Sequence, residues 1–375
     1  MAKTRSPLSE IFRLFLRLGV TGFGGPAAHL ALMEREAVEK LGWLTHEEFL
    51  DLVGGCNLLP GPSSTQVAMA LGYTRAGWAG LVVAGACFIL PATLATLALA
   101  WAYVRYGHLP QVAGLLYGAK PVMVAIVAQA VWRLGRRALR HWTMALLGAA
   151  CCAAAFAGAP PVAVLLAAGG LVLVIRLQRK GPARAAGVVL LPVSTVGGAA
   201  GLGLGSIALV FAKLGVVVFG SGYVLLAFLQ ADLVDRLHWV TGQQLLDAVT
   251  AGQVTPGPVF ATATFLGYLL RGWQGAAVAT AAIFLPSFFM AAMVGALAGR
   301  LRRSPLAGPF LDGVNVAAVA LMAEVGFALG RAALIDGWSW ALGLASAALL
   351  IVFEVNATWL ILAGAAAGIL LRSLF

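Results

Sequence analysis

A succession of long apolar segments, separated by short loops with basic residues, is the feature that most restricts how this chain can fold. Several segments approach the roughly 20 residues that an α-helix needs to cross the hydrocarbon core of a membrane. Only 10% of the residues are charged, which is too few to cover the surface of a soluble protein of this size. The segments also lack the alternation of barrel strands. The sequence therefore predicts an all-α polytopic membrane protein.

The net charge of +11 raises the question of a nucleic-acid partner. The basic residues, however, gather in short clusters between apolar segments, without interleaved aromatic residues, as the positive-inside rule describes. Three clusters are expected on the cytoplasmic side: Arg133, Arg136, Arg137 and Arg140; Arg176, Arg179, Lys180 and Arg184; and Arg300, Arg302 and Arg303. The expected partner is thus the lipid bilayer and not nucleic acid.

The chain carries an internal repeat. At a shift of 196 residues, Phe15 falls on Phe211, and Pro60-Gly61-Pro62 falls on Pro256-Gly257-Pro258. After one deletion the register continues at a shift of 195. Such a register predicts two homologous repeats, 1–177 and 207–375, joined by a linker, 178–206.

Equivalent loops of the two repeats differ in positive charge, which favours an inverted topology. The dense cluster at 133–140 corresponds to a loop with a single arginine, Arg331. Broken or re-entrant helices are expected at the Pro-Gly-Pro sequences, so the number of membrane segments is about 10 to 13. About 13 crossings place the N-terminus inside the cell, which the basic N-terminal residues favour slightly, and about 10 place it outside.

The first break, Pro60-Gly61-Pro62, interrupts an apolar segment and predicts that a new helix begins at Pro62 or Ser63. A helix start offers free N–H groups and a positive dipole end, and the hydroxyl groups that follow add donors. Such a start inside the membrane is typical of an anion site. The residues assigned to it are Pro60, Gly61, Pro62, Ser63, Ser64 and Thr65, with Pro256, Gly257 and Pro258 in the second repeat.

A second break lies near the N-terminus, where consecutive glycines precede a proline. Glycine can adopt a positive φ and allows the backbone to approach an ion closely. A kinked, close-packed helix crossing is the alternative for a single break of this kind, but four breaks in two repeat-related pairs favour binding. The assigned residues are Phe23, Gly24, Gly25 and Pro26, with Gly220, Ser221 and Gly222 in the second repeat.

These residues also carry a resemblance. Phe23 to Pro26, Gly42 to Thr45 with Phe49, and Asn57 to Pro62, with a weaker second copy, resemble the chromate ion transporter family in its long form of two fused homologous halves. The resemblance covers nearly the whole chain. It implies a secondary transporter in the bacterial inner membrane that exports chromate and confers chromate resistance. Sulfate or another oxyanion is the alternative substrate.

The two copies of the motifs differ. Gly222 stands where the first repeat has Pro26, and Gln253 stands where it has Asn57. We include Asn57 and Gln253 among the candidate binding residues and do not expect equal roles for the two repeats.

Charged residues within apolar segments are costly and become functional candidates. Lys120 would neutralise a dianion or extend to the membrane interface, and the sequence leaves both open. Glu324 is a candidate for ion coupling or a partner of Arg331. Interfacial positions are expected for Arg17 and Lys213, and a solvated helix face is expected for four acidic residues: Glu36, Glu39, Asp232 and Asp235.

An enzyme is not expected. The histidines are scattered, with no pair at the spacing of metal or haem ligands, and no nucleotide-binding motif is present. Neither a cofactor nor a metal is predicted. A membrane-embedded lipid-modifying enzyme or an assembly factor remains the alternative from another class, and the oligomeric state, including a homodimer, is left open.

Overall fold

The computed structural model describes residues 8–179, 202–219, 222–301 and 307–374, and these residues form helices without a strand. The elements of the first repeat are α1 (Leu8–Thr21), α2 (Gly25–Glu34), η1 (Arg35–Lys40), α3 (His46–Asn57), α4 (Ser63–Tyr106), α5 (Pro110–Ala138), α6 (Trp142–Phe156) and α7 (Pro161–Arg179). Those of the second repeat are α8 (Leu204–Val217), α9 (Val224–Leu229), η2 (Gln230–Arg236), α10 (Gly242–Val254), η3 (Val259–Ala261), α11 (Thr262–Leu301), α12 (Ala307–Ala333), α13 (Gly337–Val352) and α14 (Ala357–Leu374). Most of the predicted linker lies outside the described residues.

Five of the described helices are long and apolar enough to cross a membrane, which confirms the prediction of a polytopic helical membrane protein. They lie within α4, α5, α7, η3 with α11, and α12. Four further apolar helices, α6, α8, α13 and α14, have between 10 and 17 residues in their apolar parts. The total number of crossings remains a prediction.

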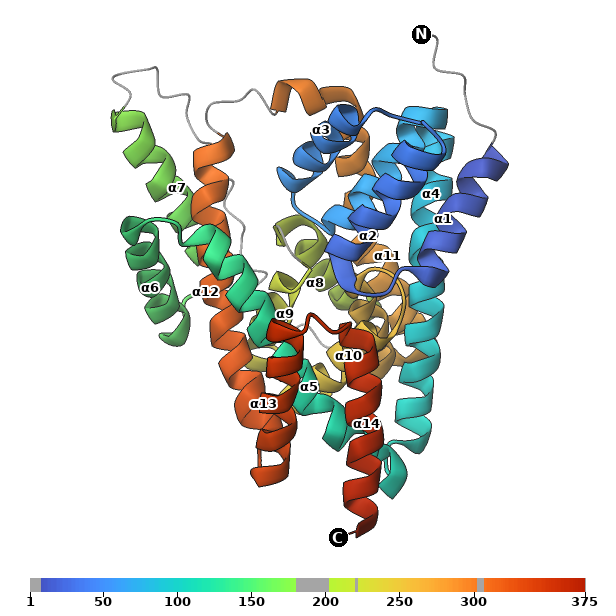
Figure 1. The fold of residues 1–375 in the computed structure, drawn as a ribbon, viewed down its shortest axis with the longest axis vertical. Coiled ribbons are helices and arrows are strands. Elements are labelled where there is room, and N and C mark those ends of the chain that lie inside the picture. The colour runs from blue at the N-terminus through green and yellow to red at the C-terminus, as the bar shows by residue number, and fades with distance from the viewer. Residues whose placement is uncertain (1–7, 180–201, 220–221, 302–306, 375) are drawn as a thin grey trace.

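Equivalent helices of the two repeats run in opposite directions, as the loop charges predict. In Figure 1, α7 ends at the top of the view, whereas its counterpart α14 ends at the bottom, where the C-terminus lies. In the same view α4 ends at the bottom and α11 ends at the top. The repeats are therefore inverted relative to one another.

The two repeats interlock through their last helices. The terminal helix of the second repeat, α14, packs along α5 of the first, and α7 of the first repeat packs along α12 of the second. Small residues make this approach possible, because a Cβ placed on Gly118 would lie 1.9 Å from the carbonyl oxygen of Gly364. Such close backbone contact is typical of helix packing in membranes. Each repeat therefore completes the bundle of the other.

The two longest helices are hairpins. Gly77 has a φ of 60° within α4, and a Cβ placed on Gly72 would lie 2.2 Å from the carbonyl oxygen of Gly80. In a continuous helix eight residues would separate the two by about 12 Å, so the chain must reverse between them. In α11 the equivalent Gly267 meets Gly275 in the same way.

The arm of α4 that precedes this reversal is short. Residues 63–75 extend about 20 Å along a helix axis, which is less than the roughly 30 Å of a bilayer core. The arm joins the Pro-Gly-Pro break to the turn at Gly77 and does not cross the membrane alone. This agrees with the expected broken or re-entrant helices.

We predict that Gly118→Ala weakens the packing of α5 against α14. The added methyl group would clash with the backbone of Gly364, and overpacking of this kind costs about 1 to 3 kcal/mol. The midpoint of thermal unfolding in detergent should fall by several degrees. Gly170→Ala in α7 is the matched control, because no atom lies within 4 Å of the added Cβ. Equal unfolding midpoints for the two variants would contradict the packing described here.

Candidate functional site

The break predicted near the N-terminus is present between α1 and α2. Gly24 and Gly25 have φ values of 101° and 79°, which a side chain would make strained, and Pro26 lies in the first turn of α2. Phe23 is partly exposed, at 38%. The turn leaves the first N–H groups of α2 without partners inside that helix. In the second repeat, Gly222 packs against Val259, while Gly220 and Ser221 lie outside the described residues.

The Pro-Gly-Pro break separates α3 from α4, and α4 begins at Ser63 as predicted. Gly61 at the centre of the break has a φ of 113°, and its equivalent Gly257 has a φ of 101°. The side-chain amide of Gln66 donates a hydrogen bond to the carbonyl oxygen of Pro60. The break is thus held by a side chain from the first turns of the helix that follows it.

The four breaks meet through two equivalent backbone hydrogen bonds. The N–H of Gly61 donates to the carbonyl oxygen of Val218 at 2.6 Å, and the N–H of Gly257 donates to that of Gly22 at 2.8 Å. At the repeat shift, Gly61 corresponds to Gly257 and Gly22 to Val218. Each Pro-Gly-Pro sequence therefore contacts the residue that begins the glycine break of the opposite repeat.

A histidine that the sequence did not indicate lies among these breaks. The Nε2 atom of His29 is 2.9 Å from the carbonyl oxygen of Gly22, and its Nδ1 atom is 3.3 Å from the hydroxyl of Ser64. Because a carbonyl only accepts, we assign the proton to Nε2, and Ser64 then donates to Nδ1. His29 is 1% exposed. The equivalent residue in the second repeat is Leu225, so the sequence repeat does not indicate that His29 lies at the breaks.

Several polar groups surround the start of α2. A Cβ on Gly25 would lie 3.6 Å from the Tyr223 hydroxyl, and one on Gly24 would lie 3.8 Å from the Nδ2 atom of Asn356. The side chains of Tyr223 and Gln253 lie close together. Gln253 is 8% exposed, and its Nε2 atom has no hydrogen-bond partner among the described residues. Polar side chains from the N-cap of α9 and from the connection between α13 and α14 therefore lie at one helix start, and Gln253 of α10 lies beside Tyr223.

Further buried polar atoms lie at the start of α4. The hydroxyls of Thr65 and Ser287 and the Oε1 atom of Gln66 have no hydrogen-bond partner within the part of the chain that the structure describes. A Cβ on Gly61 would lie 3.0 Å from the Ser287 hydroxyl. Ser63 is half-buried, whereas Asn57 at the end of α3 is exposed. Pro256 is half-buried, and Pro258 is buried.

Lys120 does not lie among the breaks. Its Nζ atom is 3.0 Å from Oδ1 of Asp247, which is 4% exposed, and donates a 2.7 Å hydrogen bond to Gln243. Gln253, near the breaks, follows Asp247 by six residues, or about 9 Å along α10. Lys120 thus has a carboxylate partner inside the protein. The sequence predicts instead that it neutralises a dianion or extends to the membrane interface.

The expectation of a solvated face is wrong for two of the four acidic residues. Glu36 is 5% exposed and pairs with Arg17 and with Lys40, whose Nζ lies 2.8 Å away. The equivalent Asp232 is 6% exposed and pairs with Lys213 at 2.8 Å. The sequence missed this because the partners come from separate helices. The other two, Glu39 and Asp235, are exposed as expected.

Glu324 is half-buried in α12. Among the described residues it forms no hydrogen bond or ion pair, with Arg331 or any other residue. Its role in coupling stays a prediction. The described residues also contain no group of three metal-ligating side chains.

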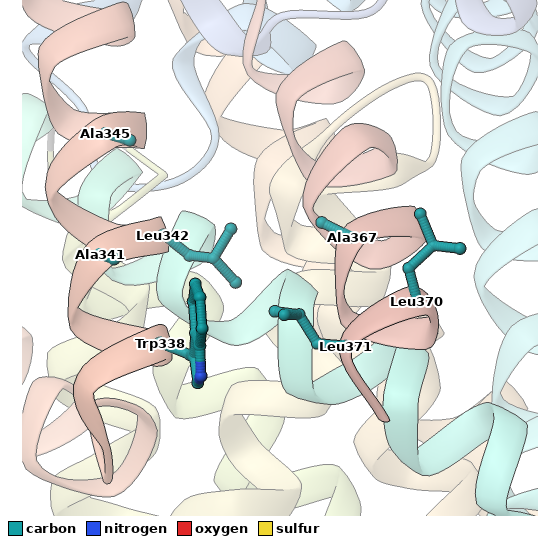
Figure 2. A pocket seen from close by; sticks show the side chains of 7 residues that line it. All are labelled: Trp338, Ala341, Leu342, Ala345, Ala367, Leu370 and Leu371. Carbon is teal, nitrogen blue, oxygen red and sulfur yellow. The ribbon is translucent and has the colours of Figure 1, made fainter. Parts of the chain in front are cut away.

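The groove between α13 and α14 is not an anion site. Figure 2 shows that its lining is apolar apart from the indole nitrogen of Trp338, with α13 and α14 supplying opposite walls. The other lining residues are Ala341, Leu342, Ala345, Ala367, Leu370 and Leu371. Trp338 and Leu370 are more than half exposed, as expected for a surface that contacts lipid.

With the breaks and their polar lining described, the chain can be compared with known proteins. The family described as "Chromate transporter" matches residues 9–174 and again 205–369. The chain belongs to this family. The double match confirms the two homologous repeats, and the resemblance seen in the sequence is correct.

Similar proteins support this membership. A chromate transport protein of Cupriavidus metallidurans is 34% identical over 96% of this chain and 92% of its own length. A probable chromate transport protein of Synechococcus elongatus is 32% identical over 90% of this chain and 88% of its own length. The uncharacterized transporter YwrB of Bacillus subtilis is 33% identical over 36% of this chain and 68% of its own length. No solved structure matches the chain. The family and the apolar helices identify a multi-pass membrane protein.

We predict that Glu36→Gln destabilises the fold at neutral pH. A hydrogen bond from Lys40, together with Arg17, holds the pKa of Glu36 below its usual range despite burial. A carboxyl group with a lowered pKa stabilises the folded state above its unfolded pKa, and this contribution is lost as the pH falls through the folded pKa. The difference in unfolding midpoint between wild type and variant should therefore shrink in acid. Glu39→Gln, at an exposed position, is the control, and an equal loss in both variants would contradict the role of the ion pairs.

Proposed function

We propose that this protein is a secondary transporter that exports chromate across the bacterial inner membrane. The observation that carries the proposal is the convergence of donors on the start of α2, where Gln253 presents a buried and unpartnered Nε2 atom. The names of the similar proteins from Cupriavidus and Synechococcus support chromate as the substrate.

The polar groups at the start of α2 fit a tetrahedral oxyanion. The free N–H groups and the positive end of the helix dipole favour a negative charge. Tyr223, Gln253 and Asn356 add side-chain donors near this helix start. A fully ionised oxyanion presents only acceptors, so donors of this kind match it on several sides.

Export of a dianion is also energetically reasonable. A negative cell interior drives anions outward, at about 2.3 kcal/mol per charge for 100 mV. Sulfate has the same shape and charge, and we retain it as the alternative substrate, for which import would require coupling. Glu324 and Lys120 are the charged candidates for coupling and for substrate attraction.

We predict that Gln253→Leu weakens chromate binding about tenfold or more, because a hydrogen bond to a charged group contributes about 1.5 to 3 kcal/mol. The affinity is measured with purified protein by equilibrium dialysis of radiolabelled chromate. Gln274→Leu, at an exposed position beyond the hairpin turn of α11, is the matched control and should bind normally. Equal affinities in both variants would remove Gln253 from the site.

Uptake into inside-out vesicles tests the transport activity itself. Chromate should accumulate in vesicles that contain the wild-type protein, and competition by sulfate and molybdate ranks the oxyanions. Modification of the anion or of lipid without accumulation would instead favour the membrane-embedded enzyme.

We predict that Ser64→Ala also weakens chromate binding, by about tenfold, because we expect the Ser64 hydroxyl to turn from His29 and donate to an anion that the starts of α2 and α4 share. The hydroxyl of Ser64 also contacts His29, so thermal unfolding is measured alongside affinity to separate a loss of folding from a loss of binding. Ser63→Ala and the double variant complete the series. Unchanged affinity in all three variants would restrict the site to the start of α2.

A further inference from the structure

The Lys120–Asp247 ion pair lies where the two repeats meet. Asp247 belongs to α10 of the second repeat, while Lys120 comes from α5 of the first. The hydroxyl of Tyr103, from α4 of the first repeat, donates to Oδ2 of Asp247 at 3.0 Å. Gln243 accepts a hydrogen bond from Lys120 and donates one to the carbonyl oxygen of Ala332 in α12. The cluster therefore connects four helices of both repeats.

Among the described residues, Lys120 is the cation that pairs with Asp247. Tyr103 from α4 is the other titratable group that faces it among the described residues. The segment η2 also packs against α10 and carries Asp232, Asp235 and Arg236, but Asp232 and Arg236 pair with each other. A buried carboxylate that loses its cation is strongly disfavoured in its ionised form. Tyr103 is neutral and cannot replace the charge of Lys120. Asp247 must then bind a proton whenever Lys120 leaves it.

Lys120 is also the more exposed partner. Its side chain is 17% exposed, compared with 4% for Asp247, and a lysine carries a compact charge on a flexible stem. An oxyanion that approaches α5 competes with Asp247 for this ammonium group. Binding of the anion to Lys120 would leave the carboxylate uncompensated.

We propose that Asp247 is a proton-binding residue that couples proton uptake to the binding of the oxyanion by Lys120. This inference rests on the proposed transport of an oxyanion and adds a coupled ion to it. The proton comes from water and forms an O–H bond on the Asp247 carboxylate, while Lys120 keeps its own proton and moves to the anion. A dianion and one proton are then held together.

The first repeat lacks this arrangement. Asp51 corresponds to Asp247, but Asn315 stands in place of Lys120 and Ala298 in place of Tyr103. The chain thus contains a matched position that has the carboxylate without the equivalent lysine. Asp51→Asn is therefore the natural control for Asp247→Asn.

The experiment measures chromate binding and proton exchange together. Purified full-length protein in nanodiscs is titrated with chromate in weakly buffered, mildly alkaline solution with a pH indicator dye, and the affinity is measured by dialysis at several pH values. Wild type should take up close to one proton per bound anion, and its affinity should weaken by up to about tenfold per pH unit as the pH rises. Protonation of chromate itself is common to all variants and cancels in the comparison.

Asp247→Asn should bind chromate without this proton uptake, whereas Asp51→Asn should behave as wild type. Lys120→Gln, as an independent variant, should bind more weakly and without the proton uptake, because its Asp247 has no cation to lose. Thermal unfolding shows whether each variant is folded. If a variant does not fold, the wild-type titration alone still tests whether a proton is taken up with the anion.

The outcomes separate this inference from the proposed function. Wild-type protein that binds chromate without taking up a proton would overturn the coupling role while leaving chromate transport intact. Loss of proton uptake in Glu324→Gln, with normal uptake in Asp247→Asn, would overturn it in favour of Glu324. Absence of chromate binding in the wild type would instead contradict the proposed function on which the inference rests.

Discussion

Two backbone hydrogen bonds between the repeats hold the centre of this structure. A helix that breaks inside a membrane leaves N–H and C=O groups that lipid cannot satisfy. Here the N–H of Gly61 donates a hydrogen bond to the carbonyl oxygen of Val218, and the N–H of Gly257 donates one to the carbonyl oxygen of Gly22. The breaks are therefore tolerated only because the opposite repeat lies against them, and the inverted duplication and the broken helices depend on each other.

The sequence predicts this scaffold well because its signals are local or repetitive. Proline and glycine mark the breaks, Ser63 begins its helix as expected, and the repeat register identifies equivalent positions. The interlocking of α5 with α14 was not predictable in the same way. Glycine spacing indicates that Gly118 allows close packing, but it does not say which helix approaches. The inversion of the repeats limits which helices can pack against Gly118, but it does not select one of them.

The candidate site is less predictable because its side chains come from distant segments. His29, Tyr223 and Asn356 belong to three different elements, and no pattern within any one of them indicates a shared neighbour. The burial of Glu36 and the pairing of Lys120 with Asp247 could not be predicted from the sequence for the same reason. Each buried carboxylate depends on a basic partner from another helix. The periodicity of a sequence shows which face of a single helix is apolar. These contacts depend instead on how several helices pack against one another, which periodicity does not show.

The symmetry of the backbone and the asymmetry of the side chains have separate physical origins. Peptide groups form the exchanged hydrogen bonds, so the scaffold keeps its two-fold arrangement while side chains around it change. Ser287 faces Gly61 where Ala92 faces Gly257, and His29 has a leucine as its counterpart. Polar chemistry can therefore concentrate on one side of a symmetric core. If the proposed anion site lies between the two equivalent breaks, the anion meets different donors on each side, and this inequality requires no change to the symmetric backbone.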